Sequence, residues 1–161
     1  MAQYDVCQVC LNGHIRNDTI HLHPEANEEY CARCGEKTIT QCPGCSADIR
    51  GAMLIQPPRG RPQACESLTA APAYCLKCGK PYPWTESKIL TAIQIFAEFG
   101  NLDEEEKKTI EQDINNIAKD IPQSELSAMR IKRIWEKYGR IAYNVIMEFT
   151  SKTAAEILKN P

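Results

Sequence analysis

Four Cys-x-x-Cys pairs lie in the first half of this chain and favour a fold built around bound metal. A Cys-x-x-Cys turn directs two sulfurs at one ion, and two such turns complete the tetrahedron that Zn²⁺ takes in structural sites. The sequence therefore predicts two zinc ions, each in a four-cysteine site. The predicted metal ligands are Cys7, Cys10, Cys31, Cys34, Cys42, Cys45, Cys75 and Cys78.

Disulfides, a redox pair and iron are the alternatives to zinc. The segment from Met1 to Asp5 leads into the first pair without an apolar run, so we expect no signal peptide and a cytoplasmic protein. Thiols stay reduced in the cytoplasm, which favours metal over disulfides. No pair opens a convincing amphipathic helix, as a thioredoxin-like redox pair would. Iron remains open, because four thiolates suit both metals.

The cysteine distribution divides the 161 residues into two predicted domains, 1–84 and 85–161. Every cysteine lies in the first, and the second is rich in Ile, Lys and Glu. Residues 1–84 carry 8 Lys/Arg and 8 Asp/Glu, and residues 85–161 carry 11 and 13, so neither has the basic excess typical of nucleic-acid binding. No apolar run approaches the roughly 20 residues that cross a bilayer, so we expect no membrane association.

Short β-like segments between the cysteine pairs predict two tandem zinc ribbons, a small metal-stabilised β domain. Sequential pairing joins the first Cys-x-x-Cys pair to the second and the third to the fourth, and it is favoured because nearby segments close loops at the lowest entropic cost. A cross-brace would join the first pair to the third and the second to the fourth. A third arrangement would join the two central pairs and leave the outer pairs to meet.

The sequence resembles a family of uncharacterised bacterial zinc-ribbon proteins, a domain of unknown function. The resemblance rests on Cys7-x-x-Cys10-Leu-Asn-Gly-His14, Tyr30-Cys-x-x-Cys-Gly35, Cys42-Pro-x-Cys45, Ile49-Arg50-Gly51 and Tyr74-Cys-x-x-Cys-Gly-Lys-Pro-Tyr-Pro-Trp84-Thr-Glu86. It covers most of the chain, including the helical tail. It implies a double zinc-ribbon head and a bacterial cytoplasmic setting, and it carries no established activity.

Three histidines, a ninth cysteine and one long segment of the first domain could also have a chemical or binding role. His14, His21 and His23 are expected to be turn or surface residues, because eight cysteines already fill two four-ligand shells. The Pro- and Gly-rich stretch 56–72 predicts a mobile loop, either a binding segment or a tolerated insertion. Cys65, within it, has no obvious local base and is expected to be a free thiol.

Helical periodicity begins at Thr85 and predicts an α-helical domain of three to four helices. The first helix is expected to stop at Gly100, and the second to start with Asp103 as N-cap and Glu106 three residues later. Ser124 opens a third helix, which continues or kinks at Gly139. The expected core-facing residues are Ile89, Ile93, Phe96, Ile110, Ile114, Ile117, Ile121, Ile131, Trp135, Tyr138, Ala142, Val145, Ile146 and Phe149, with a last turn from Ala154 to Leu158.

One face of the third helix is expected to be basic, and it is either a phosphate- or acid-binding strip or a solvated surface. It consists of Arg130, Arg133, Lys137 and Arg140. No nucleophile, base and acid stand together in the sequence, so we expect no enzyme. The sequence predicts a non-enzymatic zinc-ribbon adaptor with a protein partner. A nucleic-acid-binding ribbon protein is the alternative, and a RING-like transfer-assisting module the third reading.

Overall fold

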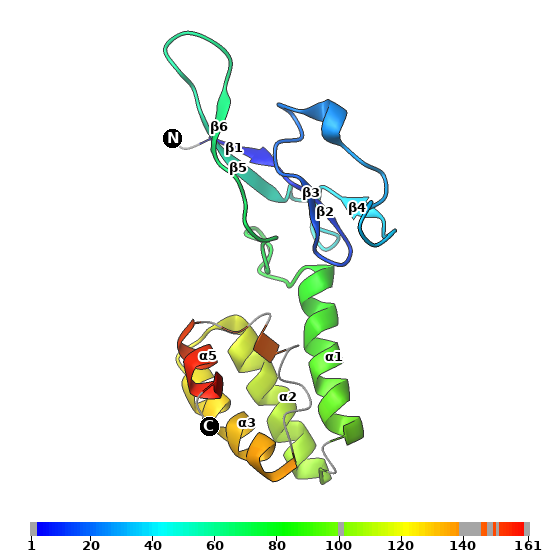
Figure 1. The fold of residues 1–161 in the computed structure, drawn as a ribbon, viewed down its shortest axis with the longest axis vertical. Helices are drawn as coiled ribbons and strands as arrows, with labels where there is room; N and C mark the ends of the chain where they lie inside the picture. The colour runs from blue at the N-terminus through cyan, green and yellow to red at the C-terminus, as the bar shows by residue number, and fades with distance from the viewer. Residues whose placement is uncertain (1–2, 100–101, 139–145, 148–149, 151, 160–161) are drawn as a thin grey trace. The chain divides into compact units, whose positions relative to one another are not determined.

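The computed structural model describes residues 3–99, 102–138, 146–147, 150 and 152–159. The chain divides into two compact units, Met1–Thr85 and Glu86–Pro161. Small β-sheets with two Cys-rich clusters form the first unit, and helices form the second, which confirms the predicted fold class at this level (Figure 1). Among the described residues, no helix is both long and apolar enough to cross a membrane.

Two three-stranded antiparallel sheets form the N-terminal unit. One has the strand order β1-β5-β6 and the other the order β3-β2-β4. Their strands are β1 (Gln3–Val6), β2 (Gln8–Cys10), β3 (Ile15–Asn17), β4 (Thr38–Ile39), β5 (Arg50–Ile55) and β6 (Gln63–Glu66), and a short 3-10 helix covers Pro24–Ala26.

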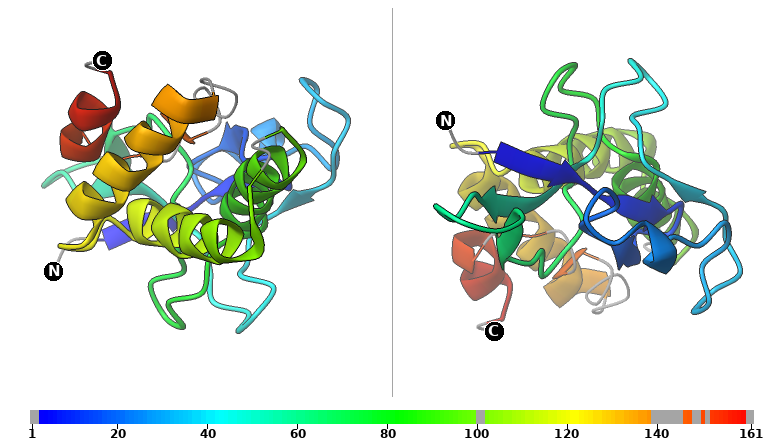
Figure 2. Two further views of the ribbon diagram at one scale, coloured as in Figure 1. Left: turned by 90° about the horizontal axis from the view of Figure 1, so that it is seen from below. Right: turned by 90° about the horizontal axis from the view of Figure 1, so that it is seen from above.

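Pairing of β1 with β5 interleaves the two halves of this unit. Strand β1 precedes all four cysteine turns, whereas β5 follows the third of them, and the two pair with Tyr4 opposite Met53. The N–H of Cys7, between β1 and β2, donates to the carbonyl of Ile49 at 2.7 Å. The unit is therefore not a simple succession of two hairpins, because its first strand belongs to a sheet completed by residues of the second half (Figure 2).

Gly51 marks a close approach of β5 to the backbone of the first half. A Cβ atom at Gly51 would lie 2.2 Å from the carbonyl oxygen of Asp18 and 2.8 Å from the carbonyl carbon of Val6. The neighbouring Ala52 N–H donates to that same Asp18 oxygen at 2.8 Å. Only glycine lets β5 pass this close to the backbone of the first half.

Part of the expected loop 56–72 is a strand. Residues Gln63–Glu66 form β6 and pair with β5, with Leu54 opposite Ala64. All four residues of β6 are exposed, so the strand has no apolar face that a sequence pattern would reveal. Cys65 lies on it as an exposed thiol, and its Sγ is 3.4 Å from the carbonyl of Met53.

The second unit contains helices α1 (Pro83–Phe99), which begins within the first unit, α2 (Glu104–Lys119), α3 (Ser124–Tyr138) and α5 (Lys152–Lys159). The predicted start of α2 is confirmed: the Asp103 side chain accepts from the N–H groups of Glu105 and Glu106, and the Glu106 carboxylate accepts from the N–H of Asp103. The helix ends before Asp120, whose backbone angles are left-handed.

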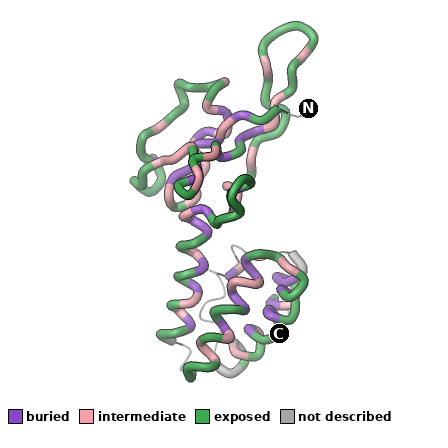
Figure 3. The backbone as a smooth tube through the Cα atoms, turned by 180° about the vertical axis from the view of Figure 1, so that it is seen from behind, coloured by how far each residue is buried: buried purple, intermediate pink, exposed green. Residues whose placement is uncertain are grey.

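Buried residues occur along each helix of this unit (Figure 3), and they form one apolar core. It contains Ile89, Ala92, Phe96, Leu102, Ile110, Ile114, Ile117, Ala118, Ala128, Ile131, Ile146, Ala154 and Leu158. The expected stripes of α1, α2 and α3 thus provide most of the core. The predicted stop at Gly100, the continuation or kink at Gly139, Ala142, Val145 and Phe149 lie outside the described residues, as do the side chains of Trp135 and Tyr138.

One carboxylate is buried in the helical unit. Asp113 of α2 is fully buried, and its Oδ1 accepts a hydrogen bond of 2.7 Å from Ser127 of α3 and lies 3.4 Å from Nη1 of the half-exposed Arg130. Its Oδ2 has no hydrogen-bond partner in the described part of the chain. Burial raises the pKa of Asp113, and Ser127 and Arg130 oppose that shift only in part.

Candidate metal centres

Three of the four cysteine turns share one backbone geometry. In each, the N–H of the first cysteine donates to the carbonyl five residues later, and the residue four positions after that cysteine has a positive φ. An isolated β-bridge closes each turn from outside. The turns begin at Cys31, Cys42 and Cys75, the carbonyls belong to Glu36, Ala47 and Lys80, and the positive-φ residues are Gly35, Ser46 and Gly79.

The first turn is built differently and ends on a histidine. The Cys10 N–H donates to the carbonyl of His14 at 3.0 Å, one residue closer than in the other turns, and the Gly13 N–H donates to the carbonyl of Cys10. The positive φ lies at Gly13, directly before His14. The His14 N–H lies 3.3 Å from Cys10 Sγ. This turn brings the His14 ring toward the Cys10 sulfur.

Two groups of four ligand atoms result, and within each group all atoms lie within 4.8 Å of one another. The first group contains Cys10, His14, Cys31 and Cys34, and the second contains Cys42, Cys45, Cys75 and Cys78. Seven of the eight predicted ligands are thereby brought together. The first group combines three thiols with one imidazole and is not the four-cysteine site that the sequence predicted.

The spacing of the sulfurs fits a tetrahedral zinc shell. Zinc lies about 2.3 Å from thiolate sulfur, so two sulfurs on one tetrahedron are separated by about 3.8 Å. In the second group, Cys42 Sγ lies 3.8 Å from Cys78 Sγ, and Cys45 Sγ lies 3.6 Å from Cys75 Sγ.

The first group fits the same test with a nitrogen in one position. The shorter zinc–imidazole bond brings nitrogen to within about 3.6 Å of a sulfur on the same tetrahedron. His14 Nδ1 lies 3.5 Å from Cys10 Sγ and 3.7 Å from Cys31 Sγ, and the sulfurs of Cys10 and Cys34 are 3.7 Å apart. Both donor sets therefore suit a closed four-coordinate metal site.

Cys7 is a correction to the predicted ligand set. Strands β1 and β2 flank it, so residues 7 to 10 are extended, and Cα atoms three residues apart in a strand are separated by about 10 Å. That separation is too long for Cys7 and Cys10 to share an ion. The Cys7 side chain is fully buried in an apolar cluster with Val9 and Ile49. Burial, assisted by the charge of Asp18, raises the pKa of the Cys7 thiol to about 12.

The pairing of the turns is sequential, as the loop-closure argument predicted. The first turn meets the second around one group, and the third meets the fourth around the other. Neither group combines ligands in the cross-brace order or from the two central turns. The structure thereby excludes the two alternatives to sequential pairing for the described residues.

Backbone N–H groups prepare two of the cysteines as thiolates. Burial raises the pKa of Cys31, but the N–H groups of Arg33 and Cys34 outweigh it and lower that pKa to about 6. The N–H groups of Cys78 and Lys77 likewise lower the pKa of Cys75 to about 6. Since metal binds thiolate and not thiol, each group contains one cysteine that is readily deprotonated.

His21 and His23 stay outside both groups, as expected. His21 is exposed, and its Nδ1 lies 2.7 Å from the buried Asp5 carboxylate, which also accepts from the N–H groups of Val6, His21 and Leu22. Burial raises the pKa of Asp5, but these hydrogen bonds outweigh it and hold the pKa below its usual range. Asp5 therefore fastens the segment around His21 to β1.

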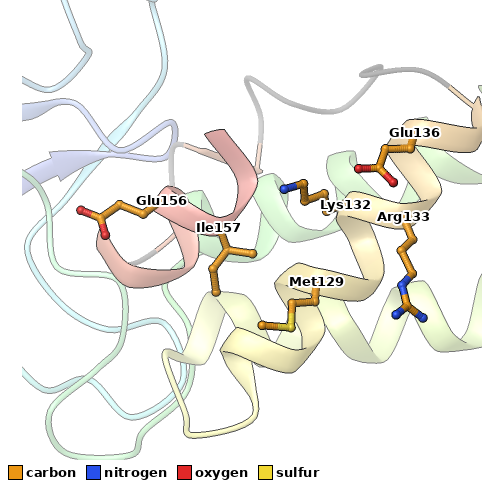
Figure 4. Close-up of a pocket in the computed structure, with 6 residues that line it drawn as sticks. All are labelled: Met129, Lys132, Arg133, Glu136, Glu156 and Ile157. Atoms are coloured by element: carbon orange, nitrogen blue, oxygen red, sulfur yellow. The ribbon is translucent and has the colours of Figure 1, made fainter. Parts of the chain in front are cut away.

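The basic face expected on α3 is interrupted by acidic groups. Arg130 lies beside Asp113, and the side chains of Lys137 and Arg140 lie outside the described residues. A surface cavity of about 520 Å³ is lined by residues of α3 and α5 (Figure 4). Its lining mixes two cations, two carboxylates and two apolar side chains, namely Lys132, Arg133, Glu136, Glu156, Met129 and Ile157.

Small β-sheets carrying two four-ligand groups, followed by helices, define a class of small proteins whose Cys-rich clusters can hold metal ions. Within that class, the chain belongs to a bacterial family, DUF2321, described as an uncharacterized protein conserved in bacteria, whose model matches residues 3–160. This confirms the resemblance inferred from the sequence. Neither the curated proteins nor the solved structures contain a match to the chain.

Proposed function

We propose that this protein is a cytoplasmic, zinc-stabilised binding module that acts through protein contacts and not as an enzyme. One observation carries the proposal: the two clusters supply four ligands each, so two zinc ions would have closed shells. A catalytic zinc keeps one position open for water or substrate. In this reading the zinc ions hold two ribbon-like halves together, and the surface around them does the binding.

Exposed apolar side chains on the turns support a protein partner. Leu76, within the fourth turn, is 72% exposed, and Tyr30, directly before the second turn, is 57% exposed. Both stand on backbone that the turn hydrogen bonds and a metal ion would make rigid. Rigid apolar side chains of this kind lose little entropy on binding, which is how interface anchors contribute affinity.

Other functions have less support. Sequential pairing of the turns argues against a RING-like module, which needs cross-braced ligands. The even charge balance of residues 1–84 makes nucleic acid the weaker candidate partner. Iron is the alternative metal, but an imidazole in the first group favours zinc over a rubredoxin-like iron site, whose ligands are thiolates.

The first test measures metal. Protein purified from its host under reducing conditions is expected to contain two zinc ions, with Cys65 as its only readily alkylated thiol. A different metal, or a zinc that binds exchangeable inhibitors such as hydroxamates, would overturn the closed-shell argument.

The second test measures binding. We expect a specific host protein to co-purify with the wild type and to be lost when Leu76 is replaced by Asp. Leu90→Asp is the matched control, because Leu90 is also an exposed leucine, at 52%, but lies on helix α1. Salt-sensitive capture of DNA or RNA in place of a protein would reverse the order of the two partners.

A further inference from the structure

A stacked aromatic pair follows the fourth cysteine turn. The rings of Tyr82 and Trp84 have centroids 4.7 Å apart and planes inclined by 17°. They are 2% and 4% exposed and lie in the same apolar cluster as Cys7, Cys42 and Cys75. Two large rings buried directly beside metal ligands are in a position to influence how those ligands are held.

Tyr82 contacts the second metal group. Its buried ring packs in one apolar cluster with the side chains of Cys42 and Cys75, which are two ligands of that group. Burial and the stack with Trp84 fix the position of this ring beside the two sulfur ligands. A buried side chain that packs against metal ligands helps to orient them from outside the shell.

Trp84 contacts the first metal group through Gly13. A Cβ atom at Gly13 would lie 3.0 Å from both Cβ and Cγ of Trp84, so the indole rests on the turn that joins Cys10 to His14. The Trp84 Nε1–H donates to the carbonyl of Pro72 at 2.9 Å, which fixes the orientation of the ring. Trp84, which follows the ligands of the second site in sequence, therefore packs directly on the turn of the first site.

We propose that Tyr82 and Trp84 are positioning residues that couple the two metal sites, so that zinc at either site raises the affinity of the other. The proposal rests on the proposed function in that both sites bind zinc. Zinc at the first site fixes the Cys10–His14 turn and forms the seat for Trp84. The stack then holds the Tyr82 ring in place against Cys42 and Cys75. The loss of conformational entropy that opposes zinc binding is then incurred only once, at the first ion, and the second ion binds to a site that is already ordered.

Native mass spectrometry measures this coupling directly. Metal-free protein is given one equivalent of zinc and the species with zero, one and two ions are counted. Two independent sites leave about half of the protein, or more if their affinities differ, with one zinc. Coupled sites give mainly metal-free and two-zinc protein. A one-zinc species that makes up half of the wild type would overturn the proposal, whereas a wild type that binds no zinc at all would instead overturn the proposed function.

Two substitutions locate the coupling in the stack. In the wild type, removing the first site with Cys34→Ser is expected to lower the zinc affinity of the second site by about 5- to 150-fold, the usual range of coupling between sites. In a Trp84→Ala background the same ligand change should leave the affinity of the second site unaltered, and Trp84→Phe should restore the coupling. An equal effect of Cys34→Ser with and without Trp84 would show that the stack is not the link.

Substitutions at two glycines provide a second test of the coupling in case Trp84→Ala fails to fold. Gly13 and Gly35 both have positive φ and both belong to turns of the first site, but a Cβ at Gly35 would meet nothing within 4 Å. Gly13→Ala and Gly35→Ala therefore introduce similar backbone strain, and only the first pushes on Trp84. We expect Gly13→Ala to lower the affinity of the second site at least about 5-fold more than Gly35→Ala does. Equal affinities in the two variants would contradict the proposal.

Tyr82→Leu tests the second ring of the stack. It leaves Trp84 on the Gly13 turn and removes the ring that packs beside Cys42 and Cys75, so the zinc affinity of the second site should fall by about 10-fold or more. Tyr30→Leu is the control, since Tyr30 is exposed. Cobalt in place of zinc gives a second readout, because its visible bands report the geometry of the bound ligands. An unchanged spectrum and affinity in Tyr82→Leu would remove Tyr82 from the mechanism.

Discussion

Substitution of Cys7 distinguishes the first metal site seen in the structure from the one that the Cys-x-x-Cys pattern predicts. Cys7 is fully buried and outside the ligand group, so Cys7→Ala removes one buried heavy atom and no metal contact. A deletion of this size costs about 1 kcal/mol of folding free energy. Because zinc binding is linked to folding, the apparent zinc affinity should fall by about 5-fold, with two zinc ions still bound.

Substitution of His14 should have the opposite result. His14→Ala opens the fourth position of the first site, and its affinity should fall by more than about 100-fold, beyond the loss that follows removal of an outer-shell partner. His21→Ala is the matched control, because His21 is exposed and outside both groups. Zinc content after dialysis against a chelator measures all three variants.

X-ray absorption at the zinc edge provides a second measurement of the same site. The structure predicts seven sulfur ligands and one nitrogen ligand over two ions, whereas a site that used Cys7 in place of His14 would give sulfur alone. The reasoning is refuted if Cys7→Ala loses one zinc ion, His14→Ala keeps both, and the absorption spectrum shows no nitrogen.

Four further predictions concern stability. Burial raises the folded pKa of Asp113, so the contribution of this residue to stability is greatest at acid pH and is lost as the pH rises through that pKa. Asp113→Asn should remove this pH dependence and stabilise the helices at pH 7 by about 1 kcal/mol, measured by thermal unfolding. Glu111→Gln, the control, should do neither. Gly51→Ala should prevent zinc retention, because its Cβ would overlap the Asp18 carbonyl, while Gly60→Ala should keep both ions. Asp103→Ala should cost about 1 kcal/mol by removing the cap of α2, measured by chemical denaturation. A strong chelator should unfold the N-terminal unit and leave the helical circular dichroism, and loss of the helical signal would show that the helices depend on the metal-bound unit.

Local pattern was sufficient for three of the four cysteine turns. Their sulfurs converge through backbone hydrogen bonds between near neighbours, and Gly35 and Gly79 provide the positive φ that such turns need. The sequence reading failed at the first turn because Cys7-x-x-Cys10 satisfies the same spacing while its backbone is drawn into strands. One contact that holds the backbone there is the hydrogen bond from the Cys7 N–H to the carbonyl of Ile49, a residue distant in sequence, so it leaves no local signal. A glycine directly before His14 was the available clue.

Amphipathic periodicity predicted the helices well because helices, like the three cysteine turns, form through contacts between residues that are near in sequence. A stripe such as Ile110, Ile114 and Ile117 has only one way to be buried, and the capping pair Asp103 and Glu106 is a contact between near neighbours. Strand β6 was not predicted because all of its residues are exposed and give no apolar alternation. It forms a strand because it pairs with β5 in a hairpin. Interleaving of β1 with β5 was missed too, since register between distant strands depends on tertiary packing.

The contact between Gly13 and Trp84 also sets the order of events during synthesis. At about 5 to 20 residues per second, a ribosome needs about 4 to 14 s to travel from residue 13 to residue 84. All four ligands of the first site are synthesised before residue 84, but until then the Gly13 turn has no indole to cover it, and β1 has no partner until β5 is made. A nascent chain therefore exposes the apolar side chains around Val9 and Ile15 until its eighty-fourth residue is available. Any fragment that ends before Trp84 should keep them exposed and aggregate even when zinc is abundant.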